Sequence, residues 1–396
     1  MRKNLSLDTL RQEVKSLVDD QRFDLIALSC GIHDEPELAF HEEHAVALLT
    51  AYLEKNGFTI ETGSGGLKTA FTASYGSGSP SIALLAEYDA LPGIGHGCGH
   101  NIIAAAAAGA AVAARRAVNV CGGTILVIGT PGEEVYGGKA IMVEAGVFAD
   151  IDVAMMVHPG VRNRVLTEAL VCVNLDIEFF GKEAHAAAYP DQGINALDAM
   201  ILAYNGVNSL RQHLREKSRI HGIITSGGEA ANVVPGYSAA KFMVRCADMD
   251  YLEELKRKVL DCFTGAALAT GARFEYRWGD VVYAPMNNNF CLARAFYENL
   301  ESLRRPLEPF DAVGRLGSTD MGNVSQVVPS IHPSIAIAPP AISLHTEEFA
   351  EAAISDGGNT GLLDGASALA MTVAGLLYDK NLLNSVTAEF KQSLSK

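Results

Sequence analysis

A thiol and an imidazole stand two residues apart in the glycine-rich segment 95–101, which reads Gly-His-Gly-Cys-Gly-His-Asn. Its glycines let the backbone turn sharply and approach a ligand closely. Cys98 and His100 can therefore face one point in space, and this pair of donors suits a borderline-soft divalent cation such as zinc. Taken alone, Cys98 would more often be a small buried hydrophobic residue. The segment becomes informative through the residues that accompany it.

Further residues of metal-binding type follow short apolar runs: Glu133, Glu134, His158 and His345. Each has an ordinary interpretation by itself, as a solvated acidic pair at a strand end or as a structural histidine. In open α/β sheets, however, ligands bind beyond the carboxyl ends of the strands. Several such residues in equivalent places therefore predict one metal site at a sheet edge.

The acidic pair Glu133-Glu134 lies in a tight loop, since Thr130-Pro-Gly132 precedes it and Gly137-Gly138 follows it. Adjacent residues of an extended segment point in opposite directions. We therefore expect one carboxylate to bind metal while the other acts as a base towards a metal-activated water. The alternative is a solvated acidic pair.

The glycines around residue 95 also resemble the start of a dinucleotide-binding loop. The G-x-G-x-x-G pattern fails at its last position, which is Cys98, and a thiol with an imidazole is out of place in a phosphate cradle. The sequence therefore disfavours a dinucleotide cofactor.

Charge and cysteine content exclude several classes of protein. The 396 residues carry a net charge of −15 without a basic run, which argues against nucleic acid and anionic membrane surfaces as partners. Seven cysteines without framework spacing favour a reducing compartment, so we expect a cytoplasmic protein. No apolar run reaches about 18 residues, so we expect no membrane span.

Apolar periodicity predicts two kinds of architecture along the chain. Helices are expected at 7–28, 42–56, 102–118 and 139–145, and strands at 81–86, 124–129 and 153–157. This alternation predicts an α/β domain, with helices on the faces of a parallel sheet.

The pattern changes from about residue 166. Strands at 171–180, 220–226, 239–245 and 272–279, with helices at 195–213 and 251–269, make a βαββαβ pattern. We therefore expect an α+β domain, 166–280, inserted between two parts of the α/β domain, 1–165 and 281–396.

The predicted inserted domain carries three polar residues of interest. His185 follows a strand, Asn232 lies in a polar loop, and Arg245 ends another strand. These side chains could hold the polar parts of a substrate, although the ordinary interpretation of His185 is an exposed turn histidine.

The motifs together resemble the M20 family of metallopeptidases and amidohydrolases. The resemblance covers nearly the whole chain, and the motifs occur in the family's order. They are Ile32-His-Asp-Glu-Pro-Glu-Leu38, Tyr88-Asp-Ala-Leu-Pro92, His96-Gly-Cys-Gly-His100, Gly132-Glu-Glu134, His158-Pro159, Gly181-Lys-Glu-Ala-His185, Asn232-Val-Val-Pro235 and His345.

The resemblance implies a role for each site residue. The implied metal ligands are Cys98, His100, Glu134, His158 and His345. Glu133 is implied as the general base and Asp89 as a residue that orients a ligand. His185 is implied to reach the partner's active site in a homodimer, while Asn232 and Arg245 bind the substrate's amide and carboxylate. The implied cofactors are two divalent ions, zinc being the expected metal and manganese, cobalt or nickel the alternatives.

The resemblance also implies the reaction, hydrolysis of an amide bond in small N-acyl amino acids or dipeptides. The chain reads Glu87-Tyr-Asp where the hippurate branch typically reads Asp-Met-Asp. With Gly317-Ser-Thr-Asp-Met-Gly-Asn323, this is similar to the branch of aminobenzoyl-glutamate and basic-dipeptide hydrolases. The alternatives are a dipeptidase that requires a free α-amine and a peptide-binding protein without catalysis, against which the retained Glu133 argues.

Overall fold

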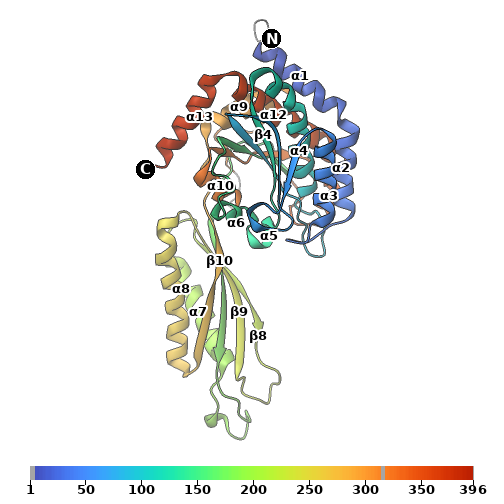
Figure 1. Cartoon of the computed structure of the whole chain (residues 1–396). Helices are drawn as coiled ribbons and strands as arrows, with labels where there is room; N and C mark the ends of the chain where they lie inside the picture. Colours follow the sequence, from blue (N-terminus) through green and yellow to red (C-terminus); the bar gives the residue numbers. More distant parts are fainter. Residues whose placement is uncertain (1–4, 314–316, 396) are drawn as a thin grey trace. The chain divides into compact units, whose positions relative to one another are not determined.

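The computed structural model describes residues 5–313 and 317–395, which form two compact units (Figure 1). Among the described residues, the first unit comprises 5–168, 286–313 and 319–395, and the second comprises Ala169–Pro285 with 317–318. The divisions after Glu168 and Pro285 lie within a few residues of those expected after 165 and 280.

The first unit is a mixed α/β unit, as its pattern predicts. Its helices are α1 (Leu7–Asp20), α2 (Arg22–Asp34), α3 (Glu43–Lys55), α4 (His100–Cys121), α5 (Glu133–Tyr136), α6 (Gly138–Glu144), α9 (Phe290–Ser302), α10 (Met321–Val327), α11 (Glu347–Ala353), α12 (Asp356–Tyr378) and α13 (Lys380–Ser393). Its strands are β1 (Thr59–Thr62), β2 (Phe71–Ser77), β3 (Ser81–Ala86), β4 (Gly123–Gly129), β5 (Val153–Met155), β6 (His158–Gly160), β11 (Ser330–Ile331) and β12 (Ser334–Ala336).

Six of these strands form one sheet in the order β1-β2-β4-β3-β5-β11. The pairs β4–β3, β3–β5 and β5–β11 are parallel, whereas β1–β2 and β2–β4 are antiparallel. The short strands β6 and β12 pair separately and in parallel. The expected parallel strands β4, β3 and β5 are therefore the central part of a mixed sheet, which the unpredicted strands β1 and β2 extend on one side and the unpredicted β11 on the other.

Helices cover both faces of the sheet, which buries every residue of β3 except the first, Ser81. Ile82, Leu84 and Ala86 belong to the large core that includes α4 and α12. Ala83 and Leu85 point to the opposite face, into a smaller core with residues of α6 and α10. Alternate side chains of a strand leave on opposite faces, and both faces of β3 are apolar for this reason.

Two helices of the first unit, α4 and α12, are long and apolar enough to cross a membrane by length and composition. Both have 89% of their most apolar window buried in the structure. Their apolar character is that of core helices, since they pack against each other.

The helix expected over 7–28 is wrong in one respect, because it is two helices that meet at Gln21. The Gln21 side chain donates a hydrogen bond to the Leu17 carbonyl and accepts one from the Tyr52 hydroxyl. The chain changes direction at Gln21, and α1 packs on both α12 and α4 while α2 packs on α4. Apolar periodicity alone does not reveal such a break.

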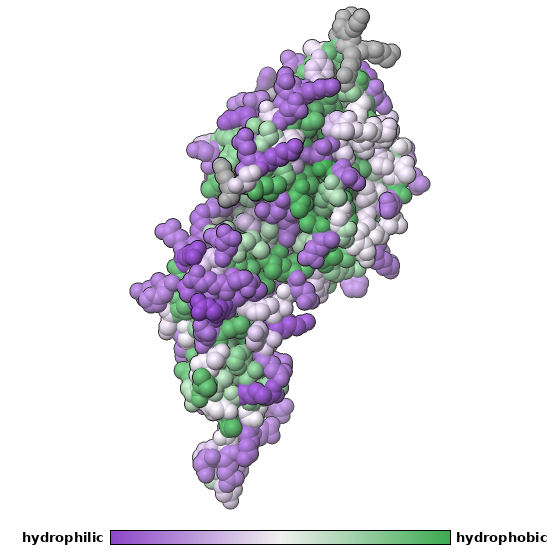
Figure 2. Space-filling view, turned by 60° about the vertical axis from the view of Figure 1, so that its left-hand side comes forward, coloured by the Kyte–Doolittle hydropathy of each residue, from purple (hydrophilic) through white to green (hydrophobic). Residues whose placement is uncertain are grey.

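The second unit has the predicted βαββαβ order: β7 (Val171–Phe180), α7 (Ala196–Leu210), β8 (Arg219–Ser226), β9 (Tyr237–Cys246), α8 (Met249–Thr270) and β10 (Arg273–Tyr283). Its antiparallel sheet has the order β10-β7-β9-β8 and packs against both helices (Figure 1). Strand β8 forms one edge. The end of this unit where the loops after β7 and β8 lie is mostly hydrophilic (Figure 2).

Candidate active site

The structure brings together seven of the predicted site residues in the first unit. Asp89 follows β3, Cys98 lies in the loop before α4, and His100 is the first residue of α4. Gly99 has a left-handed backbone (φ 76°), and a Cβ there would lie 2.5 Å from Cγ of Pro159. Glycine therefore lets this loop approach the β6 strand that carries His158.

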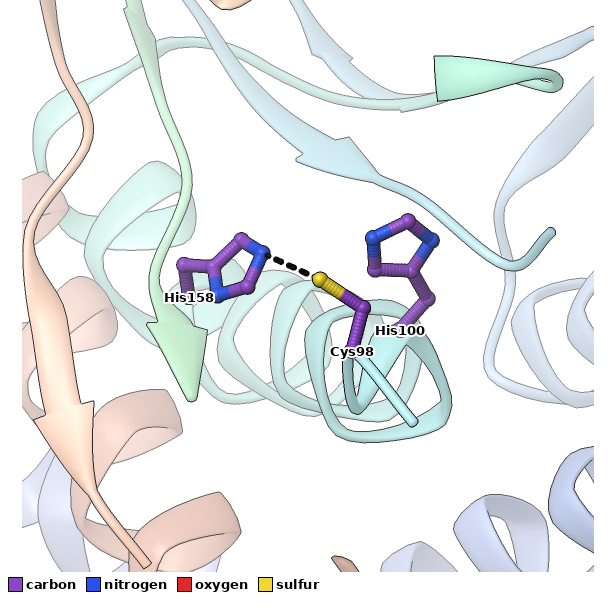
Figure 3. Close-up of side chains that lie close together, drawn as sticks. All are labelled: Cys98, His100 and His158. Atoms are coloured by element: carbon purple, nitrogen blue, oxygen red, sulfur yellow. Dashed lines mark hydrogen bonds between the residues drawn. The ribbon is translucent and has the colours of Figure 1, made fainter. Parts of the chain in front are cut away.

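Cys98, His100 and His158 converge on one point (Figure 3). One ligand atom from each lies within 4.8 Å of the others, and the Cys98 Sγ is 3.6 Å from Nε2 of His158. The Nδ1 of His158 lies 2.7 Å from the Pro159 carbonyl oxygen. A proton on Nδ1 leaves the Nε2 lone pair free for a metal ion.

The Asp89 carboxylate orients the His100 ring and the backbone of Glu134. Its Oδ1 lies 3.0 Å from Nδ1 of His100, and its Oδ2 accepts a hydrogen bond of 3.0 Å from the backbone N–H of Glu134. Asp89 and His100 are both fully buried. The imidazole is therefore fixed with Nε2 turned towards the other donors.

Glu133 and Glu134 lie in the short helix α5, not in the extended segment expected from the sequence. Gly132, with a left-handed φ of 70°, begins this turn at the N-cap, and a Cβ there would lie 2.9 Å from the Phe40 ring. Both glutamates still group with His100, with ligand atoms within 4.8 Å of one another.

Glu134 connects His100 to His345. Its Oε1 lies 3.8 Å from Nε2 of His100 and 3.5 Å from Nε2 of His345. The side chain of His345 is 53% exposed, and its backbone has a left-handed φ of 64°. Its N–H donates to the Gly97 carbonyl (2.8 Å), which ties this strained residue to the Cys98 loop. Strain of this kind is common at functional sites.

The donor set fits divalent metal ions. Nε2 of His100 and Oε1 of Glu134 are buried without a hydrogen-bond partner among the described residues. Tetrahedral zinc with nitrogen, oxygen and sulfur ligands at their usual lengths separates ligand atoms by roughly 3.3–3.6 Å. The observed separations of 3.5–3.8 Å are close to this range.

The charges of the site also favour a bound cation. Burial raises the pKa of the Cys98 thiol above its ordinary value. Burial, together with the charges of Glu87, Asp320 and Glu134, raises the pKa of Glu133 well above its usual range. Metal ions bind the deprotonated forms of such groups, so metal binding here is coupled to proton release.

The structure adds four buried polar residues to which the sequence analysis gave no role in the site, although Glu87 and Asp320 stand in motifs that it quoted. Nζ of Lys139 lies 2.5 Å from Oε1 of Glu87 and 2.7 Å from Oδ1 of Asp320, and all three side chains are at most 1% exposed. Burial lowers the pKa of Lys139, but the two carboxylates outweigh it and hold that pKa above its usual value. The fourth residue, His332, has its ring centroid 5.4 Å from that of His158.

In the second unit, His185 and Asn232 lie on neighbouring exposed loops, joined by a hydrogen bond of 3.0 Å from the Ala186 N–H to the Asn232 carbonyl. Nδ1 of His185 accepts from the backbone N–H groups of Ala187 and Ala188. The neutral ring therefore carries its proton on Nε2, as a donor that can point to a ligand.

Arg245 lies elsewhere in the second unit, beside Ser318. Nε of Arg245 and Oγ of Ser318 are buried without a hydrogen-bond partner among the described residues. The Cys172 thiol lies beside both, and burial raises its pKa although Arg245 opposes that shift. A guanidinium with a free donor and a neighbouring hydroxyl suit a carboxylate. Sequence reasoning missed Ser318.

The two groups of the second unit lie at opposite ends of its sheet. Arg245 pairs with Cys172, whereas the loop of His185 begins after Phe180, which pairs with Tyr237. Eight residues along β7 at about 3.3 Å each separate these ends by roughly 26 Å. Groups so far apart within one copy cannot both contact one amino-acid-sized ligand.

Comparisons with known proteins agree with this architecture. Residues 172–270 match the model of the peptidase dimerisation domain. The chain is 38% identical to the Xaa-Arg dipeptidase of Mus musculus, over 98% of this chain and 94% of that one. It is 31% identical to a p-aminobenzoyl-glutamate hydrolase chain of Escherichia coli, over 96% of this chain and 95% of that one.

A solved structure supports the fold. The Bacillus subtilis YXEP protein, described as a dinuclear metal-binding peptidase from the M20 family, superposes with a TM-score of 0.65 at 19% identity. The match covers 89% of this chain and 98% of that chain.

Proposed function

The chain belongs to the M20 family of metallopeptidases and amidohydrolases, and we propose that it hydrolyses the amide bond of small N-acyl amino acids or dipeptides. One observation carries the proposal. The Glu133 carboxylate lies within 4.8 Å of the ligand atoms of His100 and Glu134, so a base adjoins a metal-binding donor set. A protein that merely binds peptides has no need of that base.

Each residue of the centre has a role in this reaction. Cys98, His100, Glu134, His158 and His345 would hold two divalent ions, zinc being best suited to a thiolate with imidazoles. Such ions, when bound, polarise the scissile carbonyl and lower the pKa of water. Glu133 accepts the proton of the attacking water and passes it to the leaving nitrogen. Asp89 keeps His100 in its binding orientation.

The second unit supplies the remaining groups. The Nε2–H of His185 and the amide of Asn232 would donate hydrogen bonds to the carbonyl oxygen as it gains charge. Arg245 and Ser318 would bind the substrate's carboxylate. Because these pairs lie roughly 26 Å apart within one copy, one substrate can use both if the chain forms a homodimer and a second copy supplies His185 and Asn232.

The names of the two curated relatives indicate a common substrate class. Xaa-Arg dipeptides and p-aminobenzoyl-glutamate both have an amide whose nitrogen belongs to an amino acid with a free carboxylate. We therefore propose this arrangement as the required part of the substrate, with a variable acyl group on the other side of the bond.

An activity panel tests the proposal. It contains an Xaa-Arg dipeptide, its N-acetylated form, its C-terminal amide and p-aminobenzoyl-glutamate, each assayed before and after treatment with a chelator and after zinc or manganese is restored. We expect chelator-sensitive cleavage that the C-terminal amide abolishes. Loss of activity on N-acetylation would instead identify a strict dipeptidase. Absence of turnover on all substrates in metal-loaded protein would contradict the proposal.

A further inference from the structure

On the Nε2 side of His100, three charged side chains form a buried chain that the proposed reaction does not use. Lys139 stands between Glu87 and Asp320, and none of the three is accessible to solvent beyond 1%. Leaving a charge buried without a partner is costly, so one ammonium between two carboxylates leaves a net negative charge that invites a further cation.

The two carboxylates differ in how they use Lys139. Asp320 directs both oxygens to this residue, Oδ1 to Nζ at 2.7 Å and Oδ2 to the backbone N–H at 2.8 Å. Glu87 directs Oε1 to Nζ at 2.5 Å. Its Oε2 has no hydrogen-bond partner among the described residues and lies 3.6 Å from Nε2 of His100.

When the His100 ring is neutral, that contact joins two acceptor atoms, and a cation between them would satisfy both. His100 interacts with Asp89 through Nδ1 at 3.0 Å, so a neutral ring that donates from Nδ1 presents a lone pair at Nε2. The carboxylate oxygen of Glu87 is also an acceptor. A separation of 3.6 Å is close to that of two ligands on one zinc ion, roughly 3.3–3.5 Å for nitrogen and oxygen.

We propose that Glu87 is a further carboxylate of the metal centre, which Lys139 holds by one oxygen so that the other binds the ion at Nε2 of His100. The inference rests on the metal centre proposed above. It predicts that Glu87 and Asp320, which are alike in burial and in their partner Lys139, differ in their effect on metal affinity.

The test compares Glu87→Gln with Asp320→Asn. Each change removes one negative charge, keeps the side chain's size and leaves Lys139 one carboxylate partner, so the two variants are matched in charge and in size. Zinc and manganese dissociation constants are measured on metal-free protein by competition with a chelating dye, and circular dichroism checks folding. We expect E87Q to bind metal at least about 10-fold more weakly, because loss of a residue that merely orients a ligand already costs about 10- to 100-fold, and D320N to stay within threefold of wild type.

The outcomes separate this inference from the proposed function. Failure of wild-type protein to bind either metal would contradict the metal centre itself. Normal affinity in E87Q, or an equal loss in both variants, would overturn the role of Glu87, since an equal loss indicates a general effect of buried charge. If E87Q does not fold, Glu87→Asp replaces it, because it keeps the charge and withdraws the oxygen from His100. It must then weaken binding more than D320N does.

Discussion

At the scale of single residues, Glu133 is the side chain whose loss should separate catalysis from metal binding. We predict that Glu133→Gln keeps the fold and the bound metal but lowers kcat by about 10²- to 10⁴-fold, the usual contribution of a general base. Metal analysis and steady-state kinetics on the same sample measure both properties. Glu144→Gln, at an exposed position at the end of α6, is the matched control. Near-normal turnover in pure E133Q would refute the assignment.

Cys98 and His100 should behave differently from Glu133, because we propose that they hold the metal. We predict that Cys98→Ala or His100→Ala lowers both bound metal and activity, since the remaining donors cannot close the site. The half-buried Cys30 provides the control variant Cys30→Ala. The measurement is metal stoichiometry after dialysis. Full stoichiometry in both variants would mean that the glycine-rich segment is structural.

Residue types and spacing were sufficient to predict which side chains cluster here but not what surrounds them. Cys98, His100 and Glu134 lie in glycine-rich turns or after buried strands, where the sequence marks them. Lys139 follows Gly137-Gly138, a context typical of a solvated loop, and lysine is almost never fully buried unless it is paired. Its partner Asp320 is 181 residues away, so only tertiary structure reveals the pair.

At the scale of elements, the close packing of α4 depends on Gly109. A Cβ there would lie 2.5 Å from Cδ1 and 2.6 Å from Cδ2 of Leu25, which is itself fully buried. We predict that Gly109→Ala destabilises the protein by overpacking, about 1–3 kcal/mol, offset by up to about 1 kcal/mol of helix propensity.

The control for this prediction is Gly375→Ala in α12, where the nearest atoms would lie at 3.6 Å, an ordinary contact distance. It should be neutral or stabilise by up to about 1 kcal/mol. Urea unfolding followed by circular dichroism measures both variants. Equal stabilities would show that α2 and α4 can separate without cost.

The sequence predicted those elements whose apolar pattern is strong, namely β3, β4, α4 and the βαββαβ order of the second unit. It did not predict β1, whose residues are mostly exposed (Thr59–Thr62), because a strand that buries little has a weak pattern. It also gave Glu133 an extended backbone, since a helix of four residues, Glu133–Tyr136, is too short for helical periodicity.

At the scale of the whole molecule, the length of the second unit's sheet limits which of its polar residues can belong to one active site. Its two groups of polar residues, at Arg245 and at His185, lie roughly 26 Å apart along β7. The edge strand β8 has exposed Ile223 and Ile224, and an unpaired edge of this kind can pair with another chain. A symmetric dimer would let each copy supply His185 to its partner's site.

Co-expression of His185→Ala chains with Glu133→Gln chains tests this arrangement. If His185 acts on the partner's site, a mixed dimer contains one site with both changes and one site with neither, because each copy contributes one group to each site. We predict that the isolated heterodimer recovers up to about half of wild-type activity, although each parent is nearly inactive. If His185 served its own copy, every site would carry one change, and the heterodimer would be as inactive as its parents. That result, or a monomer at assay concentration, would contradict the exchange.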